Sequence, residues 1–206
     1  MEVVMQSYTA LLALHDKLGS EIFASQLYRR GWKILATEGT AKHIRGHGLA
    51  LKTVEELTGM PPLFEGRVRT LHPKVFGGIL YEPSNVAHKG DLRKINAPLI
   101  NIVAVNFRPF DEVIKSEESS RDILRAIDVG GVALLHAVSK MCNDERVFPV
   151  VDPKDYREII EVIRERPSPI IPGKLWNDLH RKALKYRLGY ENAVATWLLD
   201  NELKVK

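Results

Sequence analysis

The chain has 206 residues, of which 45% are apolar and 27% charged, a composition typical of one soluble globular domain with a filled core. No apolar run approaches the ~20 residues that span a bilayer. The N-terminus does not resemble a signal peptide, and a single cysteine, Cys142, excludes an internal disulfide, so we expect a cytoplasmic protein. The net charge of +4 is spread among 26 acidic residues, which favours a small anionic substrate over nucleic acid.

Short apolar runs alternate with helical patterns, and neither an internal repeat nor a long linker interrupts them, so residues 1–206 are expected to form a single domain. A helix is expected to begin near Glu38, and another to run from Pro153 to about Arg166. Strands alternating with helices predict an α/β fold of three layers, with a mostly parallel sheet covered on both faces. The expected strands are 9–14, 32–37, 101–107 and 147–152.

The helix expected over residues 19–30 has Ser20 as its predicted cap and Gly31 just after its end. The residues expected to face the sheet are Ile22, Phe23 and Leu27. The tail, residues 174–201, is predicted to form a C-terminal extension of two helices that meet near Gly189. Its apolar stripes are typical of packing surfaces, either for the core or for a subunit interface.

Three glycine-containing turns are candidates for chemistry, and the first lies between a predicted strand and a predicted helix, at 36–41. Backbone N–H groups at a helix N-terminus, with the hydroxyls of Thr37 and Thr40, form a potential phosphate site around Gly39. Turns of this kind also occur as ordinary helix caps. Glu38 would repel an anion if its side chain pointed inward.

The second segment runs from Gly66 to Lys74 and is rich in basic residues. It is either a solvated turn or a loop that presents Arg67, Arg69 and Lys74 to an anion or a developing oxyanion.

The third segment places Asp128 before a pair of glycines, so a carboxylate and backbone amides are exposed together. Asp128 is as well explained by a helix cap as by a catalytic role. His136 and Lys140 are four residues apart on one helix face, which predicts that both look toward Asp128.

These segments together resemble one enzyme family. GRVRTLHPKVFGGIL closely matches the GRVKTLHPKVHGGIL signature of IMP cyclohydrolase, the N-terminal domain of a bifunctional purine-biosynthesis protein. AIDVGGVALLHAVSK is similar to that family's IDIGG…LLRAAAKN segment, VAVNFRPF to VVVNLYPF, and ATEGTAK to STGGTA. The resemblance covers roughly residues 9–200 in the correct order.

The resemblance implies a methylglyoxal-synthase-like fold, a homodimer, and closure of 5-formamidoimidazole-4-carboxamide ribotide (FAICAR) to inosine monophosphate (IMP) without a metal or cofactor. It places the proton-transferring lysine at Lys140, with Asp128, Arg69 and Thr70 as further catalytic candidates. The substrate-binding candidates are Asp16, Lys17, Thr37, Glu38, Gly39, Thr40, Arg67, Val105, Asn106, Val129 and Gly130.

The chain departs from the family pattern at five polar positions, where the family has serine, glycine, lysine, tyrosine and arginine. These positions are His15, Glu38, Arg69, Arg108 and His136. Arginine keeps the charge of lysine but not its compact geometry, and Arg108 cannot supply a phenol proton. The departures motivate an alternative in which the chain is a non-catalytic purine-nucleotide sensor.

Overall fold

The computed structural model describes residues 8–116, 119–141, 146–165 and 168–201. Cys142 and the helix end expected at Arg166 lie outside these residues. In the described part of the chain, no helix combines the length and apolar character needed to cross a membrane. The helices are α1 (Ser20–Tyr28), α2 (Glu38–Arg45), α3 (Val54–Thr58), α4 (Pro73–Leu80), α5 (Val86–Ile95), α6 (Phe110–Ser116), α7 (Ser120–Arg125), α8 (Val129–Lys140), α9 (Tyr156–Glu165) and α10 (Gly173–Asp200), with the 3-10 turns η1 (Phe64–Gly66) and η2 (Pro153–Asp155).

The described strands form one five-stranded sheet, in the order β3-β2-β1-β4-β5, and every neighbouring pair is parallel. The expected parallel sheet is therefore confirmed. The central strand β1 lies between β2 and β4. The chain that leaves β1 continues to β2, whereas the chain that leaves β4 continues to β5, so the two connections run in opposite directions along the sheet. Such a switch point is where open α/β sheets bind ligands, beyond the carboxyl ends of the strands. The strands are β1 (Thr9–Leu14), β2 (Lys33–Ala36), β3 (Lys52–Thr53), β4 (Ile102–Asn106) and β5 (Phe148–Val150).

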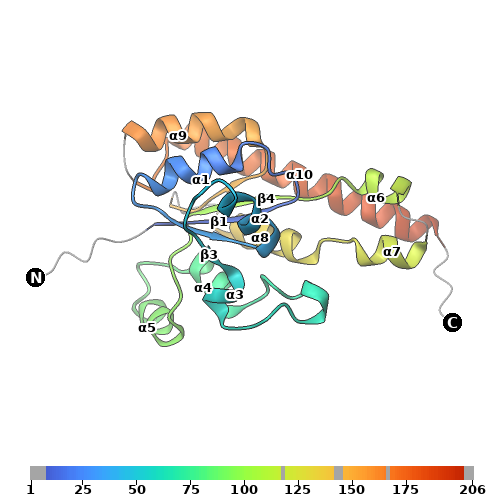
Figure 1. The fold of residues 1–206 in the computed structure, drawn as a ribbon, viewed down its shortest axis with the longest axis horizontal. Coiled ribbons are helices and arrows are strands. Elements are labelled where there is room, and N and C mark those ends of the chain that lie inside the picture. Colours follow the sequence, from blue (N-terminus) through green and yellow to red (C-terminus); the bar gives the residue numbers. More distant parts are fainter. Residues whose placement is uncertain (1–7, 117–118, 142–145, 166–167, 202–206) are drawn as a thin grey trace, which may run out of the picture.

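Both faces of the sheet are covered, so the apolar residues of β1 are buried whichever way they point. Leu12 packs with α1 and α9 on one face, and Leu11 packs with α4 and α8 on the other. Figure 1 shows α1 and α9 on one side of the strands and α4 and α8 on the opposite side. A sheet buried on both faces explains why its strands are continuous apolar runs.

Helix α10 is continuous over 28 residues, so the predicted break near Gly189 is wrong. A glycine inside a helix costs only about 1 kcal/mol relative to alanine, and tertiary packing outweighs that cost. Leu179 belongs to the core on the α1 side of the sheet, whereas Ala183 and Trp197 belong to the core on the α8 side. The helix thus passes from one core to the other and contacts β5 on the way.

Two predictions about α1 are also wrong. Ser20 is the first residue of the helix rather than its cap, and its hydroxyl donates to the Lys17 carbonyl at 2.8 Å. Ile22 is 61% exposed, whereas Phe23 and Leu27 are fully buried as expected. Gly31 has a φ of 81°, the left-handed conformation expected just past a helix end.

Candidate active site

A polar cavity of about 710 Å³ lies beyond the carboxyl ends of β1, β2 and β4. His15 follows β1, Thr37 follows β2, and Arg108 follows β4, so the cavity opens at the switch point of the sheet. The N-terminal turn of α8 and the segment from Glu65 to Thr70 form its other walls. Segments far apart in the sequence therefore meet where the topology predicts a ligand site.

The cavity brings together about half of the residues predicted from the sequence. Those that line it are Thr37, Arg67, Arg69, Thr70, Asn106, Asp128, Val129 and Gly130. Those that do not line it are Asp16, Lys17, Glu38, Gly39, Thr40, Val105 and Lys140. Of the five family departures, His15, Arg69 and Arg108 line the cavity, whereas Glu38 and His136 do not.

Asp128 is a helix cap that also lines the cavity, so the cap and a role in the site are compatible. It is the N-cap of α8, because its carboxylate accepts the N–H of Gly131 at 2.7 Å, and it also lines the cavity. Burial raises the pKa of Asp128, although the Gly131 amide and the nearby charges of Arg69 and His15 act in the opposite direction. A capped carboxylate with a raised pKa beside a cavity is a candidate for proton transfer.

The two glycines after Asp128 are required by close packing. A Cβ on Gly130 would lie 2.7 Å from the hydroxyl of Thr70, and a Cβ on Gly131 would lie 2.5 Å from the ring of Phe107. Both distances are shorter than any real contact of that kind, so a larger residue would push Thr70 or the end of β4 away. The GG pair is what allows α8 to begin against the cavity wall.

Asn106 supports the loop after β1 rather than offering its side chain to a ligand. Its amide oxygen accepts the N–H groups of His15 and Asp16 at 2.7 and 2.8 Å, and its amide nitrogen donates to the Asp16 carbonyl at 2.9 Å. Thr40 acts in the same way, since its buried hydroxyl accepts the Leu14 N–H at 3.0 Å. Both side chains position the backbone that bounds the cavity.

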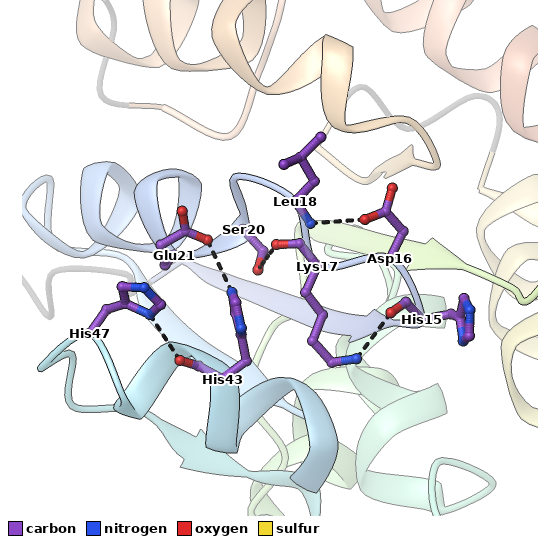
Figure 2. A network of polar contacts seen from close by, with 8 residues as sticks. All are labelled: His15, Asp16, Lys17, Leu18, Ser20, Glu21, His43 and His47. Atoms are coloured by element: carbon purple, nitrogen blue, oxygen red, sulfur yellow. Dashed lines mark hydrogen bonds and ion pairs between the residues drawn. The ribbon is translucent and has the colours of Figure 1, made fainter.

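Asp16 and Lys17 are engaged with the same loop (Figure 2). The ammonium of Lys17 donates to the His15 carbonyl at 3.0 Å, and the Asp16 carboxylate accepts the Leu18 N–H at 3.0 Å. On the far side of the loop, His43 of α2 lies 3.1 Å from Glu21 of α1. The first two contacts lie within the loop, and the third links α2 to α1.

Two predicted basic residues lie elsewhere. Lys74 is in the first turn of α4, and its ammonium donates to the Leu57 carbonyl at 3.0 Å, so it is not presented to the cavity. Lys140 is the last of the 12 residues of α8, about 18 Å along the helix axis from Asp128 at 1.5 Å per residue. The prediction that Lys140 looks toward Asp128 is wrong within one chain, because a shared helix face does not make distant turns neighbours.

Lys140 instead lines a second hollow, an open and mainly apolar groove of about 710 Å³ between α8 and α10. We call it the α8–α10 groove. His136 is also part of its wall and lies 2.7 Å from Arg187 of α10. The groove meets the polar cavity at Ile127, Asp128 and Val129, which line both.

With this geometry established, comparison with known proteins places the chain in a family. The family model for the MGS-like domain matches residues 20–133, more than half of the chain. The chain belongs to the MGS-like domain family. The matched segment includes the turn at Thr37, the Arg67–Thr70 segment and the start of α8.

Individual relatives of this MGS-like domain are purine biosynthesis proteins. The chain is 39% identical over 156 residues to the bifunctional purine biosynthesis protein PurH of Aquifex aeolicus, covering 76% of the chain and 30% of the relative. It is 36% identical over 200 residues to the protein of the same name from Dictyostelium discoideum, covering 94% and 36%. The chain therefore spans about a third of the length of these curated relatives. A solved structure described as the crystal structure of ForH superposes with a TM-score of 0.79 at 30% identity, covering 92% of this chain and 97% of the other.

Three residues of this MGS-like domain were not singled out as site residues by the sequence. Tyr190 accepts the N–H of Asp128 at 2.9 Å, and Tyr186 accepts the N–H of Phe107 at 2.7 Å, so α10 supports the backbone at two walls of the site. A partly buried tyrosine needs a partner for its hydroxyl, which is the signal that was available. The third, Glu55, lies 3.2 Å from the Nε of Arg69, and no sequence pattern indicates that pairing.

No group of three or more histidine, cysteine, aspartate or glutamate side chains suited to a metal ion occurs among the described residues.

Proposed function

We propose that this chain closes FAICAR to IMP, a cyclohydrolase reaction of purine biosynthesis in the cytoplasm. The observation that carries the proposal is the convergence of Asp128, Arg69 and Thr70 with the N-terminal amides of α8 on one cavity. The resemblance of the sequence to IMP cyclohydrolase and the names of its relatives support the same reaction.

The reaction joins the carboxamide nitrogen of FAICAR to its own formyl carbon and then loses water. It transfers no electrons and needs no activated donor, so its chemistry requires neither a metal nor a cofactor. The obstacles are a weak amide nucleophile, a formamide that rotates freely, and negative charge that builds on the formyl oxygen. A site that fixes the ribotide and stabilises that oxygen addresses the last two.

Asp128 and the turn that follows it are proposed to act on the reacting groups. The Asp128 carboxylate would accept a hydrogen bond from the carboxamide N–H and draw a proton from it. The amides of Val129 and Gly130 have no partner within the helix because they belong to its first turn, and the helix dipole adds to their positive potential. Together with Arg69, they would stabilise the oxyanion.

The turn at the start of α2 is proposed to hold the 5′-phosphate. Thr37 lines the cavity, and the N–H groups of the first turn of α2 provide an anion site at a helix N-terminus. Holding the phosphate there and the base near Asp128 would remove rotational freedom before the ring closes.

Lys140 requires a second copy of the chain if it takes part. The α8–α10 groove is open and mainly apolar, it has Lys140 in its wall, and it meets the cavity at Asp128. We propose that two chains pair across this groove as a homodimer, with the lysine of one chain reaching the cavity of the other to relay the proton toward the departing water.

The decisive test is an assay with purified protein and FAICAR, in which IMP formation is followed spectrophotometrically and the product is identified by chromatography. Turnover is expected without folate, nucleotide or metal, and EDTA should not inhibit it.

The second candidate is a nucleotide sensor, favoured by the three departures that line the cavity. Arg108 donates to Ser116 at 2.6 Å and lines the cavity where the family has a tyrosine. IMP binding without any turnover of FAICAR would support the sensor and contradict the enzyme.

A further inference from the structure

A carboxylate on α3, that of Glu55, lies against Arg69. Both oxygens of Glu55 are shielded from solvent, and among the described residues no hydrogen bond reaches either of them. The nearest cation is Arg69, whose Nε lies 3.2 Å from the Glu55 carboxylate. That Nε is also buried and has no hydrogen-bond partner among the described residues, so the contact is an ion pair shielded from solvent rather than a directed hydrogen bond. The side chain of Glu55 is only 18% exposed. A carboxylate withdrawn from water in this way depends on its one charged neighbour.

Arg69 is restricted on a second side by the backbone. Gly66 has a φ of 88°, and a Cβ at that position would lie 2.6 Å from the Nη2 atom of Arg69. The guanidinium therefore packs directly over the Cα of Gly66 while its Nε faces Glu55. These two contacts define where the guanidinium lies, and it lines the cavity from that position.

We infer that Glu55 is a positioning residue for Arg69 in the proposed ring closure, an inference that rests on the proposed function. A guanidinium on a flexible stem stabilises an oxyanion well only if its orientation is set before charge develops, since reorganisation during the reaction weakens the effect. Glu55 holds the inner Nε edge and so leaves the terminal nitrogens for the cavity.

The pair also limits the charge that Asp128 experiences. Arg69 is close enough to Asp128 to lower the pKa of that carboxyl. Glu55 compensates part of the positive charge of Arg69, so it weakens this effect. By offsetting part of the charge of Arg69, Glu55 keeps the pKa of Asp128 closer to the working pH, as a general base requires.

Stability alone does not explain the pairing of Glu55 with Arg69. Buried ion pairs are often no more stabilising than apolar residues of the same size, so a gain in stability gives little reason for a carboxylate at this place.

Glu56, next in sequence, provides the matched control. It belongs to the same helix, completes a capping box with Thr53 and pairs with Arg45 at 3.1 Å. It makes no ion pair with Arg69 among the described residues.

The experiment compares Glu55→Gln with Glu56→Gln in the full chain, alone and in an Arg69→Ala background. Glu55→Gln should lower kcat by about tenfold or more while leaving the affinity for IMP within about twofold, since positioning acts mainly in the transition state. The acid limb of the kcat/KM profile should move to lower pH. In the Arg69→Ala background, Glu55→Gln should change kcat by less than about twofold, because the residue that it positions is gone. Glu56→Gln should leave kcat unchanged in both backgrounds.

A second readout does not depend on turnover. The Nε–H of Arg69, assigned by the loss of its NMR signal in Arg69→Lys, should exchange slowly with water in the wild type and in Glu56→Gln, and rapidly in Glu55→Gln. If the wild type does not turn over FAICAR, the proposed function fails, and this signal alone decides whether Glu55 fixes Arg69. Wild-type kcat in Glu55→Gln, additive losses in the double variant, or an unchanged Nε–H signal would each overturn the inference.

Discussion

The polar cavity and the α8–α10 groove have the same volume, about 710 Å³ each, and share Ile127, Asp128 and Val129, yet they differ in how they are built. The cavity is built from strand ends and helix N-termini, where backbone N–H groups lack partners. The groove is built mainly from the flanks of α8 and α10, with Phe76 and Leu80 of α4, where backbone groups are already bonded and only side chains are available. The N-terminal turn of α8 therefore suits ligand chemistry, and its flank suits packing against another surface.

Lys140 shows why this distinction matters. The resemblance to IMP cyclohydrolase predicts it as the proton-transferring lysine, but its place at the end of α8 assigns it to the groove. Variants of the cavity should impair each chain by itself, whereas variants of the groove should act through the pairing of chains.

The largest expected effect comes from Asp128, the one ionisable residue among those that line both hollows. Asp128→Asn should lower kcat by about a hundredfold or more, because asparagine cannot accept the proton. The cap should survive, since an asparagine oxygen also accepts the Gly131 N–H, so IMP affinity should be retained. Stopped-flow or steady-state turnover, with IMP titration alongside, measures both. Turnover close to wild type would exclude Asp128 as the general base.

The same variant has a stability signature. Burial raises the pKa of Asp128, so the folded wild type binds more protons than the unfolded chain above the ordinary pKa of aspartate. Stability attributable to this group is complete below that ordinary value and is lost as pH rises through the raised pKa. The free energy of unfolding of Asp128→Asn relative to wild type should therefore increase with pH across this window. Denaturant titrations at several pH values would show an opposite trend if the pKa of Asp128 were lowered.

Removing the groove lysine should cost nearly as much activity but in a different manner. Lys140→Ala should lower kcat by about a hundredfold with little change in the fold. If each site combines two chains, mixing Lys140→Ala with Asp128→Asn after subunit exchange should restore about a quarter of wild-type activity, since half of the dimers are mixed and each has one intact site. Each variant treated alone is the control. No recovery would mean that Lys140 does not act across a dimer.

A charge in the groove should have a smaller effect on activity. Ala195 is exposed and lines the groove, so Ala195→Asp should fold normally but weaken pairing, because a buried unpaired carboxylate costs free energy at an interface. Light scattering should show monomers, and specific activity at low protein concentration should fall about tenfold if the lysine of the partner is needed. Thr196→Asp, exposed on α10 but not lining the groove, is the matched control. An unchanged dimer in Ala195→Asp would place the interface elsewhere.

Local patterns predicted four of the five described strands and the strand-end part of the site, but not the two-residue strand β3. Buried parallel strands are continuous apolar runs, and polar residues just after them must meet at one edge of the sheet, as Thr37 and Asn106 do. The patterns did not predict the hydrogen-bond partner of each side chain. Asn106 and Thr40 bond to the loop after β1, a contact that depends on how neighbouring strands align.

Contacts between segments that are distant in the chain could not be predicted from the sequence, for a physical reason. The i,i+4 spacing of His136 and Lys140 describes a helix face but not which neighbour covers it, and that neighbour is α10. The pairing of Glu55 with Arg69 depends on the packing of α3 against the segment after it, which neither helical nor strand periodicity encodes.

The smallest expected effect concerns Glu38 at the proposed phosphate turn. The residue is exposed, does not line the cavity and makes no ion pair among the described residues, so its side chain lies in solvent rather than facing an anion in the cavity. Solvent and salt screen an exposed charge, and an acidic residue in the first helical turn also stabilises α2 through the helix dipole. Glu38→Gly should therefore change the Kd of IMP by less than about threefold at physiological salt, with slight tightening at low salt.

Glu38→Gln separates charge from backbone freedom, because it removes the carboxylate without the flexibility of glycine. Titration of IMP against the three proteins at two ionic strengths measures the difference. A marked loss of affinity in Glu38→Gly but not in Glu38→Gln would mean that the turn needs a side chain for its shape, and a marked loss in both would mean that the carboxylate itself contacts the nucleotide.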